Sequence, residues 1–349
     1  MSIELNATFY YDDDFNVYLT PYDVWKSSKK CHFYYYDNLF SQFDWKTEPT
    51  VSLQQLYKER AQQIRDDYEY VILCYSGGND SSNILETFYF NDIHIDEIVV
   101  VGALSQDKTK NTDDNHNADI YLNVIPTLNS MNLPNTKITV VDYTNFFRDI
   151  SQFSLIKDHG SNYLEYIGYH TSPHHLFWHD FRKFVGATNT KKTAWIMGTE
   201  KVDLAYDKET RKPFVFFNES AIYSYGLRYV DENFERVNFY NGPHKCAANI
   251  QIKQAHVLHR ELSTITVPNI KGKLIRNRHY KNKLFYEKEH IKLAYQSEKS
   301  KQRYLSIRDM FLKQNINSDI YSVYIDGLKN HKEYLERGIT ITSKPYYIT

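Results

Sequence analysis

Apolar residues recur along the chain at two spacings, one typical of helices and the other typical of buried strands. Residues 53–68, with the sequence LQQLYKERAQQIRDDY, place four apolar side chains on or near one face of a predicted helix, namely Leu53, Leu56, Ala61 and Ile64. The following run, YVILCY, is continuously apolar and ends shortly before two glycines. A short apolar run bounded in this way is typical of a strand that is buried on both faces of a parallel sheet.

Helical and apolar segments continue to alternate beyond this first strand. Helices are expected near residues 80–90, 119–131, 162–169 and 175–185, and strands at 97–104, 137–143 and 194–197. Such alternation predicts an α/β fold with an open, mostly parallel sheet that is flanked by helices. Ligands of these folds bind beyond the carboxyl ends of the strands, so the loops that follow the strands are the candidate binding segments.

The two ends of the chain differ in composition from this alternating part, which covers residues 51–260. Residues 1–50 are aromatic and acidic without a long period, and they predict an N-terminal cap of short strands or irregular structure. Residues 261–349 form a basic C-terminal region, in which residues 271–313 hold 13 Lys or Arg and 4 Asp or Glu. Their apolar residues have loosely helical spacing, so we expect this region to be helical.

Overall composition narrows the class of protein. The 349 residues include 42 Lys or Arg and 43 Asp or Glu, and the mean hydropathy is -0.60. Because the sequence has no run of about 18 apolar residues and no signal-peptide pattern, we expect a cytoplasmic protein that does not enter a membrane. Cys31, Cys74 and Cys246 lie far apart without CxxC spacing, which favours neither a disulfide framework nor a zinc ribbon.

The segment between the first predicted strand and the next helix carries the main candidate site. It reads Ser76-Gly77-Gly78-Asn79-Asp80-Ser81-Ser82. Two glycines let the backbone turn tightly around an anion, and the following helix N-terminus adds N–H groups and the positive end of a dipole. A phosphate site is therefore predicted, and it is not a Walker loop because no lysine follows the glycines. A glycine turn that serves packing alone is the alternative.

The same residues resemble the SGGxDS signature of the PP-loop ATP pyrophosphatases, the superfamily that includes asparagine synthetase and GMP synthetase. The resemblance is greatest to asparagine synthetase C-terminal-domain-like proteins, over roughly residues 50–260. It implies an adenine nucleotide alpha-hydrolase-like fold that uses ATP and Mg²⁺ and cleaves ATP between its α and β phosphates. It also implies that residues 76–82 bind the nucleotide and that Asp80 is a catalytic residue that holds Mg²⁺ on the pyrophosphate.

The ends of two other predicted strands supply further candidates. The strand at 194–197 is followed by GTEKVD, which partly resembles the GxGxDE-type loop of the family. It departs from that loop in lacking the second glycine and the Asp-Glu pair. Glu200 and Asp203 could supply acidic ligands of Mg²⁺ there, with a solvated loop as the alternative. The residues expected to contact the nucleotide at these strand ends are Gly102, Ala103, Leu104, Met197 and Gly198.

Two lysines outside the loop are candidate catalytic residues. Lys245 and Lys253 lie beside or within the helical segment IKQAHVLHREL, and the resemblance implies that a lysine outside the loop stabilises the leaving pyrophosphate. A solvated helix face explains the same pattern. His175 and His179 have i,i+4 spacing, but HHLFWHD lacks the HExxH arrangement, so pocket or surface histidines are expected rather than a metal site.

Together these features predict an ATP-dependent ligase that forms AMP and pyrophosphate. It would adenylate a carboxylate or carbonyl and transfer it to ammonia or an amine, so small-molecule carboxylate and amine substrates are the expected partners. Glutamine-dependent synthetases of this kind begin with a catalytic cysteine after the initiator methionine, whereas this chain begins Met1-Ser2. We therefore expect ammonia to come from solution or from a partner, or a different amine to be the nucleophile.

Two other functions stay open at this point. A PP-loop enzyme that modifies a base of tRNA or DNA would activate a base carbonyl, and residues 271–313 would contact the nucleic acid. A solvated helical bundle explains the charge of that region equally well. A non-catalytic nucleotide-binding protein is the other, and the intact loop at residues 76–81 argues against it, whereas the imperfect segment GTEKVD keeps it open. Sulfur transfer is supported by a single cysteine, Cys246. The pattern predicts no oligomeric state.

Overall fold

The computed structural model describes most of the predicted sheet domain and parts of both ends. The described residues are 8–18, 20–102, 120–142, 153–166, 174–186, 190–198, 201–218, 233–264, 281, 284–286, 316–336 and 341–349. Within these ranges, no helix combines the length and the apolar character needed to cross a membrane. Most of the basic stretch 271–313, and with it the prediction that it is helical, lies outside the described residues.

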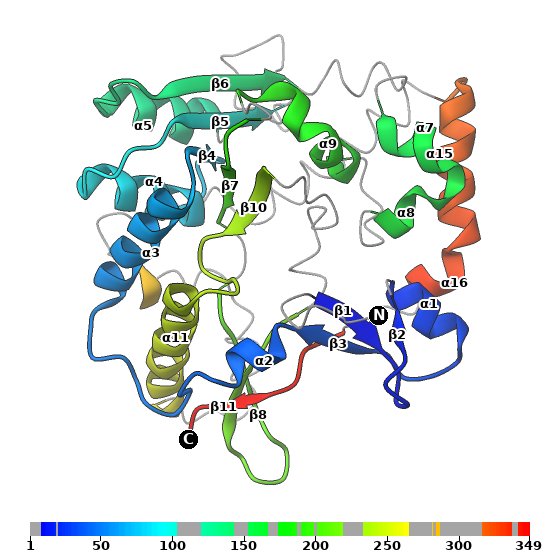
Figure 1. Cartoon of the computed structure of the whole chain (residues 1–349), viewed down its shortest axis with the longest axis horizontal. Coiled ribbons are helices and arrows are strands. Elements are labelled where there is room, and N and C mark those ends of the chain that lie inside the picture. The colour runs from blue at the N-terminus through cyan, green and yellow to red at the C-terminus, as the bar shows by residue number, and fades with distance from the viewer. Residues whose placement is uncertain are drawn as a thin grey trace.

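Five parallel strands form the central sheet, in the order β10-β7-β4-β5-β6 (Figure 1). These strands are β4 (Tyr70–Cys74), β5 (Glu97–Gly102), β6 (Lys137–Asp142), β7 (Thr193–Met197) and β10 (Phe234–Asn238). All four neighbouring pairs are parallel. The predicted open α/β sheet is therefore confirmed, and β10 adds an edge strand that the apolar pattern did not predict.

Helices cover both faces of this sheet, as Figure 1 shows. On one side lie α3 (Leu53–Asp67), α4 (Asn79–Phe90), a π-helical turn (Ile120–Val124), α5 (Ile125–Ser130) and α11 (Lys245–Ser263). On the other side lie α7 (Ser154–His159), a 3-10 turn (Gly160–Asn162), α8 (Tyr163–Tyr166), α9 (His174–Asp180), a second 3-10 turn (Phe181–Phe184) and α15 (Asp319–Asn330). The short helix α16 (Lys332–Glu336) follows α15.

The alternation of side chains along β4 explains the two separate cores. Val71 and Leu73 point to the side of α3 and α4 and join one apolar cluster. Ile72 and Cys74 point the other way and join a second cluster with residues of α7 to α9. Because every one of these side chains is buried, β4 is the central strand that its uniformly apolar sequence predicts.

Two small antiparallel sheets lie outside the central one. The N-terminal sheet contains β1 (Thr8–Tyr11), β2 (Val17–Tyr18) and β3 (His32–Tyr35), with the short helices α1 (Pro21–Lys26) and α2 (Asp37–Phe40) beside it. The other contains β8 (Asp203–Tyr206), β9 (Pro213–Phe216) and β11 (Tyr346–Tyr347). The short strands expected for residues 1–50 are therefore present. The end of the chain is extended rather than helical, because β11 pairs with β9.

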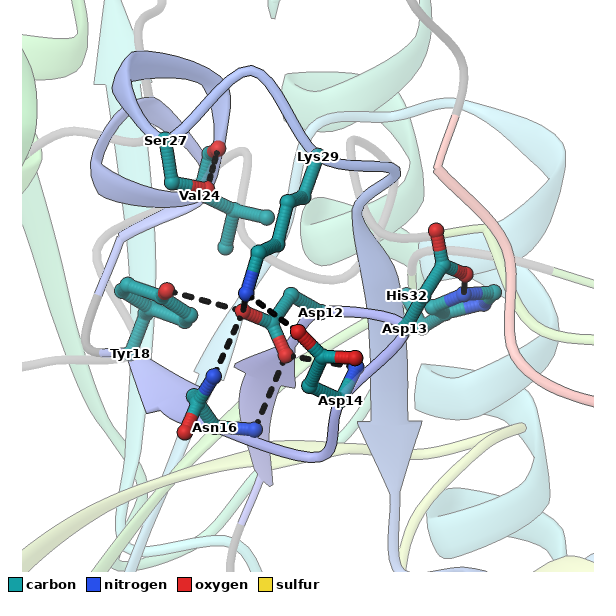
Figure 2. A network of polar contacts seen from close by, with 9 residues as sticks. All are labelled: Asp12, Asp13, Asp14, Asn16, Tyr18, Val24, Ser27, Lys29 and His32. Carbon is teal, nitrogen blue, oxygen red and sulfur yellow. Dashed lines mark hydrogen bonds and ion pairs between the residues drawn. The ribbon is translucent and has the colours of Figure 1, made fainter.

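A buried carboxylate holds the turn between β1 and β2 (Figure 2). Asp12 is 0% exposed. Its Oδ1 accepts the backbone N–H groups of Asp14 and Asn16, each at 2.9 Å. Its Oδ2 accepts the Asn16 amide and the Tyr18 hydroxyl, each at 2.9 Å, and the Lys29 ammonium at 3.0 Å. Five donors therefore converge on one carboxylate, which ties the segment before β3 to the first hairpin.

This network predicts that the N-terminal sheet weakens in acid. Burial raises the pKa of Asp12, but the hydrogen bonds from Asn16, Lys29 and Tyr18 outweigh it and hold that pKa well below its usual range. The folded state therefore binds fewer protons there than the unfolded state, so this stabilisation is complete above about pH 4 and is lost as the pH falls further. We expect Asp12→Asn to unfold at a lower temperature at pH 7 and to show a smaller loss of stability between pH 6 and pH 3.

Thermal unfolding followed by circular dichroism at several pH values measures this difference. Asp14→Asn is the matched control, because the Asp14 side chain is 69% exposed and accepts a hydrogen bond from the same lysine. Equal acid dependence in Asp12→Asn and the unmodified protein would contradict the assignment.

Candidate functional site

The strand order identifies the edge of the sheet where a ligand would bind. After β4 the chain builds β5 and β6 on one side, and it then returns to place β7 and β10 on the other side. Neighbouring loops diverge at such a reversal, so a crevice opens beyond the carboxyl ends of the two strands that flank it. Here those strands are β4, which is followed by Tyr75 and Ser76, and β7, which is followed by Gly198.

The loop after β4 has the geometry of an anion-binding turn. Gly77 has a φ of 74°, a left-handed conformation that glycine adopts without steric cost. Gly78 is the N-cap of α4 and has no side chain to cover the first N–H groups of this 12-residue helix. The Ser81 hydroxyl lies 3.1 Å from the Ser76 hydroxyl and accepts the Ser76 N–H at 3.2 Å. These contacts fix the turn in place while Ser76 and Gly78 remain exposed.

Asn79, in the first turn of α4, is buried although its side-chain amide makes no hydrogen bond with the described residues. It is 6% exposed, and among the described residues neither its amide nitrogen nor its amide oxygen has a hydrogen-bond partner. An unsatisfied buried polar group costs on the order of 1–3 kcal/mol, so such groups are rare in folded proteins. A ligand with both a donor and an acceptor would remove this cost. Ser82, one turn of chain further on, is also buried and lies 3.3 Å from the Tyr75 hydroxyl.

Asp80 is bound by two groups that come from distant parts of the sequence. Its Oδ1 lies 2.5 Å from the Lys201 ammonium and accepts the Tyr286 hydroxyl at 2.6 Å. The Lys201 ammonium also lies 5.3 Å from the centre of the Tyr286 ring. Gly198 packs directly on the same residue, since a Cβ at Gly198 would lie 3.1 Å from the Asp80 carbonyl carbon. Asp80 is therefore a junction between α4, the segment after β7 and the C-terminal region.

Two buried tyrosines complete this junction. Tyr240, which follows β10, donates a hydrogen bond from its hydroxyl to the Asp80 carbonyl at 3.0 Å and accepts one from Asn83 at 2.9 Å. Burial and the Asp80 charge raise the pKa of both Tyr240 and Tyr286. Both phenols therefore stay protonated at neutral pH, and both can donate hydrogen bonds to Asp80. Their rings lie 6.1 Å apart and form one wall beside the helix N-terminus.

The described residues do not make a magnesium site around Asp80. Asp203 binds Lys281 at 2.9 Å, and Glu200 lies outside the described residues. Among the residues described, no group of three His, Cys, Asp or Glu side chains could hold a metal ion. The Asp80 carboxylate itself carries the Lys201 ammonium, a cation already in contact with one oxygen. The Mg²⁺ ligation by Asp80, Glu200 and Asp203 stays a prediction that this donor set does not support.

Of the residues expected to contact a nucleotide at the other strand ends, the structure describes some and not others. Gly102 ends β5 beside Asp142 of β6, whereas Ala103 and Leu104 lie outside the described residues. Met197 is 7% exposed and packs in the apolar cluster on the α9 side of the sheet. Gly198 is the member of this group that touches the loop helix. Contact of any of them with a nucleotide stays a prediction.

Lys245 and Lys253 both lie on α11. Lys245 begins the helix, directly after the N-cap His244, whose Nδ1 accepts the Cys246 N–H at 3.1 Å. Lys253 binds Glu48 at 2.7 Å and donates to the Pro49 carbonyl at 2.9 Å. This lysine therefore ties α11 to the segment that precedes α3, which is a structural role. Catalysis by either lysine stays a prediction.

Cys246, Cys74 and His179 have surroundings that suppress reactivity. Burial raises the pKa of the Cys246 thiol, which disfavours the thiolate that sulfur transfer needs. Cys74 accepts a hydrogen bond from the Trp195 indole at 2.6 Å inside the core, and burial raises the pKa of its thiol as well. Burial lowers the pKa of His179 to about 4, so its ring is neutral at pH 7. Side-chain positions of His174 and His175 lie outside the described part of the structure.

A cavity of about 510 Å³ lies at the opposite end of the sheet. It opens between the end of α4 and the segments that enter β5 and β6, and its walls include Phe88, Ile95 and Leu133. This is the amino end of the strands, whereas ligands of open parallel sheets bind at the carboxyl ends. The cavity is therefore separate from the candidate site at Ser76–Ser81.

Comparison with protein-family models, with curated proteins and with solved structures found no match to this chain. The candidate site therefore rests on geometry and on the sequence of the loop. Three residues of this site were missed by sequence reasoning, namely Lys201, Tyr240 and Tyr286. Lys201 stands within the segment GTEKVD, whose acidic residues are the ones that resemble metal ligands, and the two tyrosines carry no local signal in a chain with 31 tyrosines.

Proposed function

We propose that this chain is an ATP-dependent ligase of adenine nucleotide alpha-hydrolase-like fold that forms AMP and pyrophosphate. The acceptor is a carboxylate or carbonyl oxygen, which attacks the α-phosphorus of ATP while the bond to the β-phosphate breaks. The adenylated acceptor then reacts with ammonia or an amine, and AMP leaves. Pyrophosphate, AMP and an amide or imine-type product account for all the atoms transferred.

One observation carries this proposal. The SGGNDS loop leaves the central strand β4 at the reversal of strand order and runs directly into the N-terminus of α4. Its two glycines, its exposed N-cap and the unsatisfied amide of Asn79 suit an anionic ligand that also offers hydrogen-bonding groups. A loop that served packing alone would not explain a buried amide without a partner.

The residues around the loop have separate roles in this proposal. Backbone N–H groups of residues 77–80 bind phosphate oxygens, and the hydroxyls of Ser76 and Ser81 hold the loop and orient it. The Tyr240 hydroxyl fixes the first turn of α4 through the Asp80 carbonyl. In this proposal the rigid support keeps the α-phosphorus in line with the acceptor oxygen. Holding the two reacting groups in this geometry lowers the activation barrier for the transfer.

Product analysis tests the proposed function. The protein is incubated with Mg²⁺ and ATP and with separate pools of amino acids with ammonia, other carboxylates with amines, and tRNA, and AMP is resolved from ADP. We expect AMP and pyrophosphate in equal amounts, with one pool required for turnover. ADP with phosphate, or no nucleotide cleavage with any pool, would overturn the proposal.

A further inference from the structure

We propose that Lys201 supplies the positive charge that meets the phosphate groups of the ligand, and that Asp80 positions this lysine instead of holding a divalent cation. This inference rests on the proposed function, because it takes the SGGNDS loop as the phosphate site. It assigns Lys201 as a ligand-contacting residue and Asp80 as a positioning residue.

The first argument is the placement of Lys201. The residue follows β7 by only a few positions, so its backbone lies at the carboxyl edge of the sheet, next to the loop after β4. Its side chain is 5% exposed and ends 2.5 Å from Asp80 in the first turn of α4. A buried ammonium at a helix N-terminus faces the positive end of the helix dipole, which is unfavourable without a nearby anion. Asp80 supplies that anion, and the phosphate groups of a ligand would supply more negative charge.

The second argument is that one oxygen of the Asp80 carboxylate already binds a cation and a hydroxyl. Lys201 and Tyr286 both bind Oδ1, and the Tyr286 ring lies beside the ammonium. A divalent cation on Oδ1 would have to displace the lysine, and a divalent cation on Oδ2 would lie close to the same ammonium and be repelled by it. Asp203, the other described carboxylate of this segment, is engaged by Lys281. The acidic groups here thus orient lysines.

The third argument concerns what holds the pair in place. Gly198 lets β7 approach the Asp80 backbone closely, and Lys281 donates to the Val202 carbonyl at 2.7 Å. The segment that carries Lys201 is therefore held on both sides, at Gly198 and at Val202. With its backbone held in this way, Lys201 would turn its ammonium from Asp80 toward a phosphate at the loop by a change of side-chain rotamer alone.

Binding of inorganic pyrophosphate and of ATP, measured by calorimetry on the full chain, tests this inference. Each ligand is titrated once in EDTA and once in Mg²⁺, against the unmodified protein, Lys201→Met, Lys201→Arg and Asp80→Asn. We expect binding in EDTA, a loss of about 10- to 100-fold in affinity for Lys201→Met in both buffers, and recovery of most of that loss in Lys201→Arg. Asp80→Asn keeps the cation and should lose less than Lys201→Met.

Arg65→Met is the matched control, because it also removes a mostly buried cation from an ion pair, here with Asp96, but lies at the amino end of the strands and away from the loop. Its affinity for pyrophosphate should equal that of the unmodified protein, and thermal unfolding of every variant reports folding separately. Pyrophosphate and ATP binding that requires Mg²⁺ and is unchanged in Lys201→Met would overturn the inference.

The two proposals can fail separately. If AMP and pyrophosphate form but Lys201→Met binds ATP normally, the inference is wrong and the proposed function stands. If Lys201 controls pyrophosphate binding but no nucleotide is cleaved, the anion site stands and the ligase is wrong. If the unmodified protein binds neither ligand in either buffer, both are wrong.

Discussion

Replacing Gly198 with valine is expected to reduce AMP-forming turnover by about 100-fold or more while the protein still folds. A Cβ at this position would lie 3.0 Å from the Ile84 side chain, 3.1 Å from the Asp80 carbonyl carbon and 3.2 Å from the Asp80 Cβ. Two of these atoms belong to the first turn of α4, so the larger side chain must push the helix N-terminus away from β7. A displacement approaching 1 Å is enough to misplace a bound phosphate chain. Turnover and ATP affinity are measured together with thermal unfolding.

Gly242→Ala is the matched control for this substitution. Its Cβ would meet the Arg60 side chain at 3.4 Å and the Asn238 carbonyl oxygen at 3.7 Å, which are ordinary contacts. This glycine also follows a strand of the central sheet, β10, and its replacement should leave turnover within a few-fold of normal, on the order expected for uncrowded sites. Normal turnover in Gly198→Val would remove the close contact between β7 and α4 from the description of the site.

Replacing Gly327 with alanine is expected to lower the free energy of unfolding by about 1–3 kcal/mol, the usual cost of overpacking. Gly327 lies in α15, and a Cβ there would come within 2.5 Å of the Tyr163 ring and 2.8 Å of the Ser161 carbonyl oxygen. The Tyr163 hydroxyl also donates a hydrogen bond to the carbonyl of Tyr324, in the same helix, at 3.1 Å. An added methyl group must separate α15 from α8 and the turn before it, which lie side by side in Figure 1.

Urea unfolding monitored by tryptophan fluorescence and by circular dichroism measures this loss. Ser322→Ala tests the same helix at an exposed position, where the hydroxyl bonds only locally to the Asp319 carbonyl, and it should change stability by less than about 0.5 kcal/mol. Equal stability of the two variants would show that α15 does not dock closely on the helices beside it.

Local pattern was enough to predict the elements around β4. The run YVILCY, the glycines after it and the amphipathic segments on either side gave α3, β4 and α4 nearly at their observed bounds. Each of these features is set by neighbouring residues, through burial on both strand faces or a 3.6-residue period. The helix expected at residues 119–131 begins with a π-helical turn, and that expected near 162–169 is the short α8 after a 3-10 turn.

The order of the strands in the sheet, unlike the single elements, could not be predicted from the local sequence. Nothing in the sequence of β7 or β10 specifies that they lie on the opposite side of β4 from β5 and β6. That choice depends on how helices from both halves of the chain share the two faces of the sheet. It also decides which loop faces the loop after β4, and so it decides which residues of the segment GTEKVD reach Asp80.

The partners of Asp80 illustrate the same limit. Its family resemblance predicts a metal ligand, whereas the structure places a lysine and a tyrosine on its carboxylate. Tyr286 lies 206 residues away along the chain, in a region whose sequence differs from the rest by its positive charge. A contact over such a distance has no local signal, because neither residue's neighbours change in a way that a period or a motif detects.

The contacts of β11 with the N-terminal part of the molecule can form only late during synthesis of the chain. The Tyr346 hydroxyl donates to Asp37 at 2.6 Å, across a separation of 309 residues, and the Tyr346 ring stacks on Trp45 at 4.9 Å. At roughly 5–20 residues per second, a ribosome needs about 15–60 s to translate the intervening chain. During that interval the aromatic side chains around α2 lack one of their native neighbours, so this part of the fold is completed only after the last strand has been made.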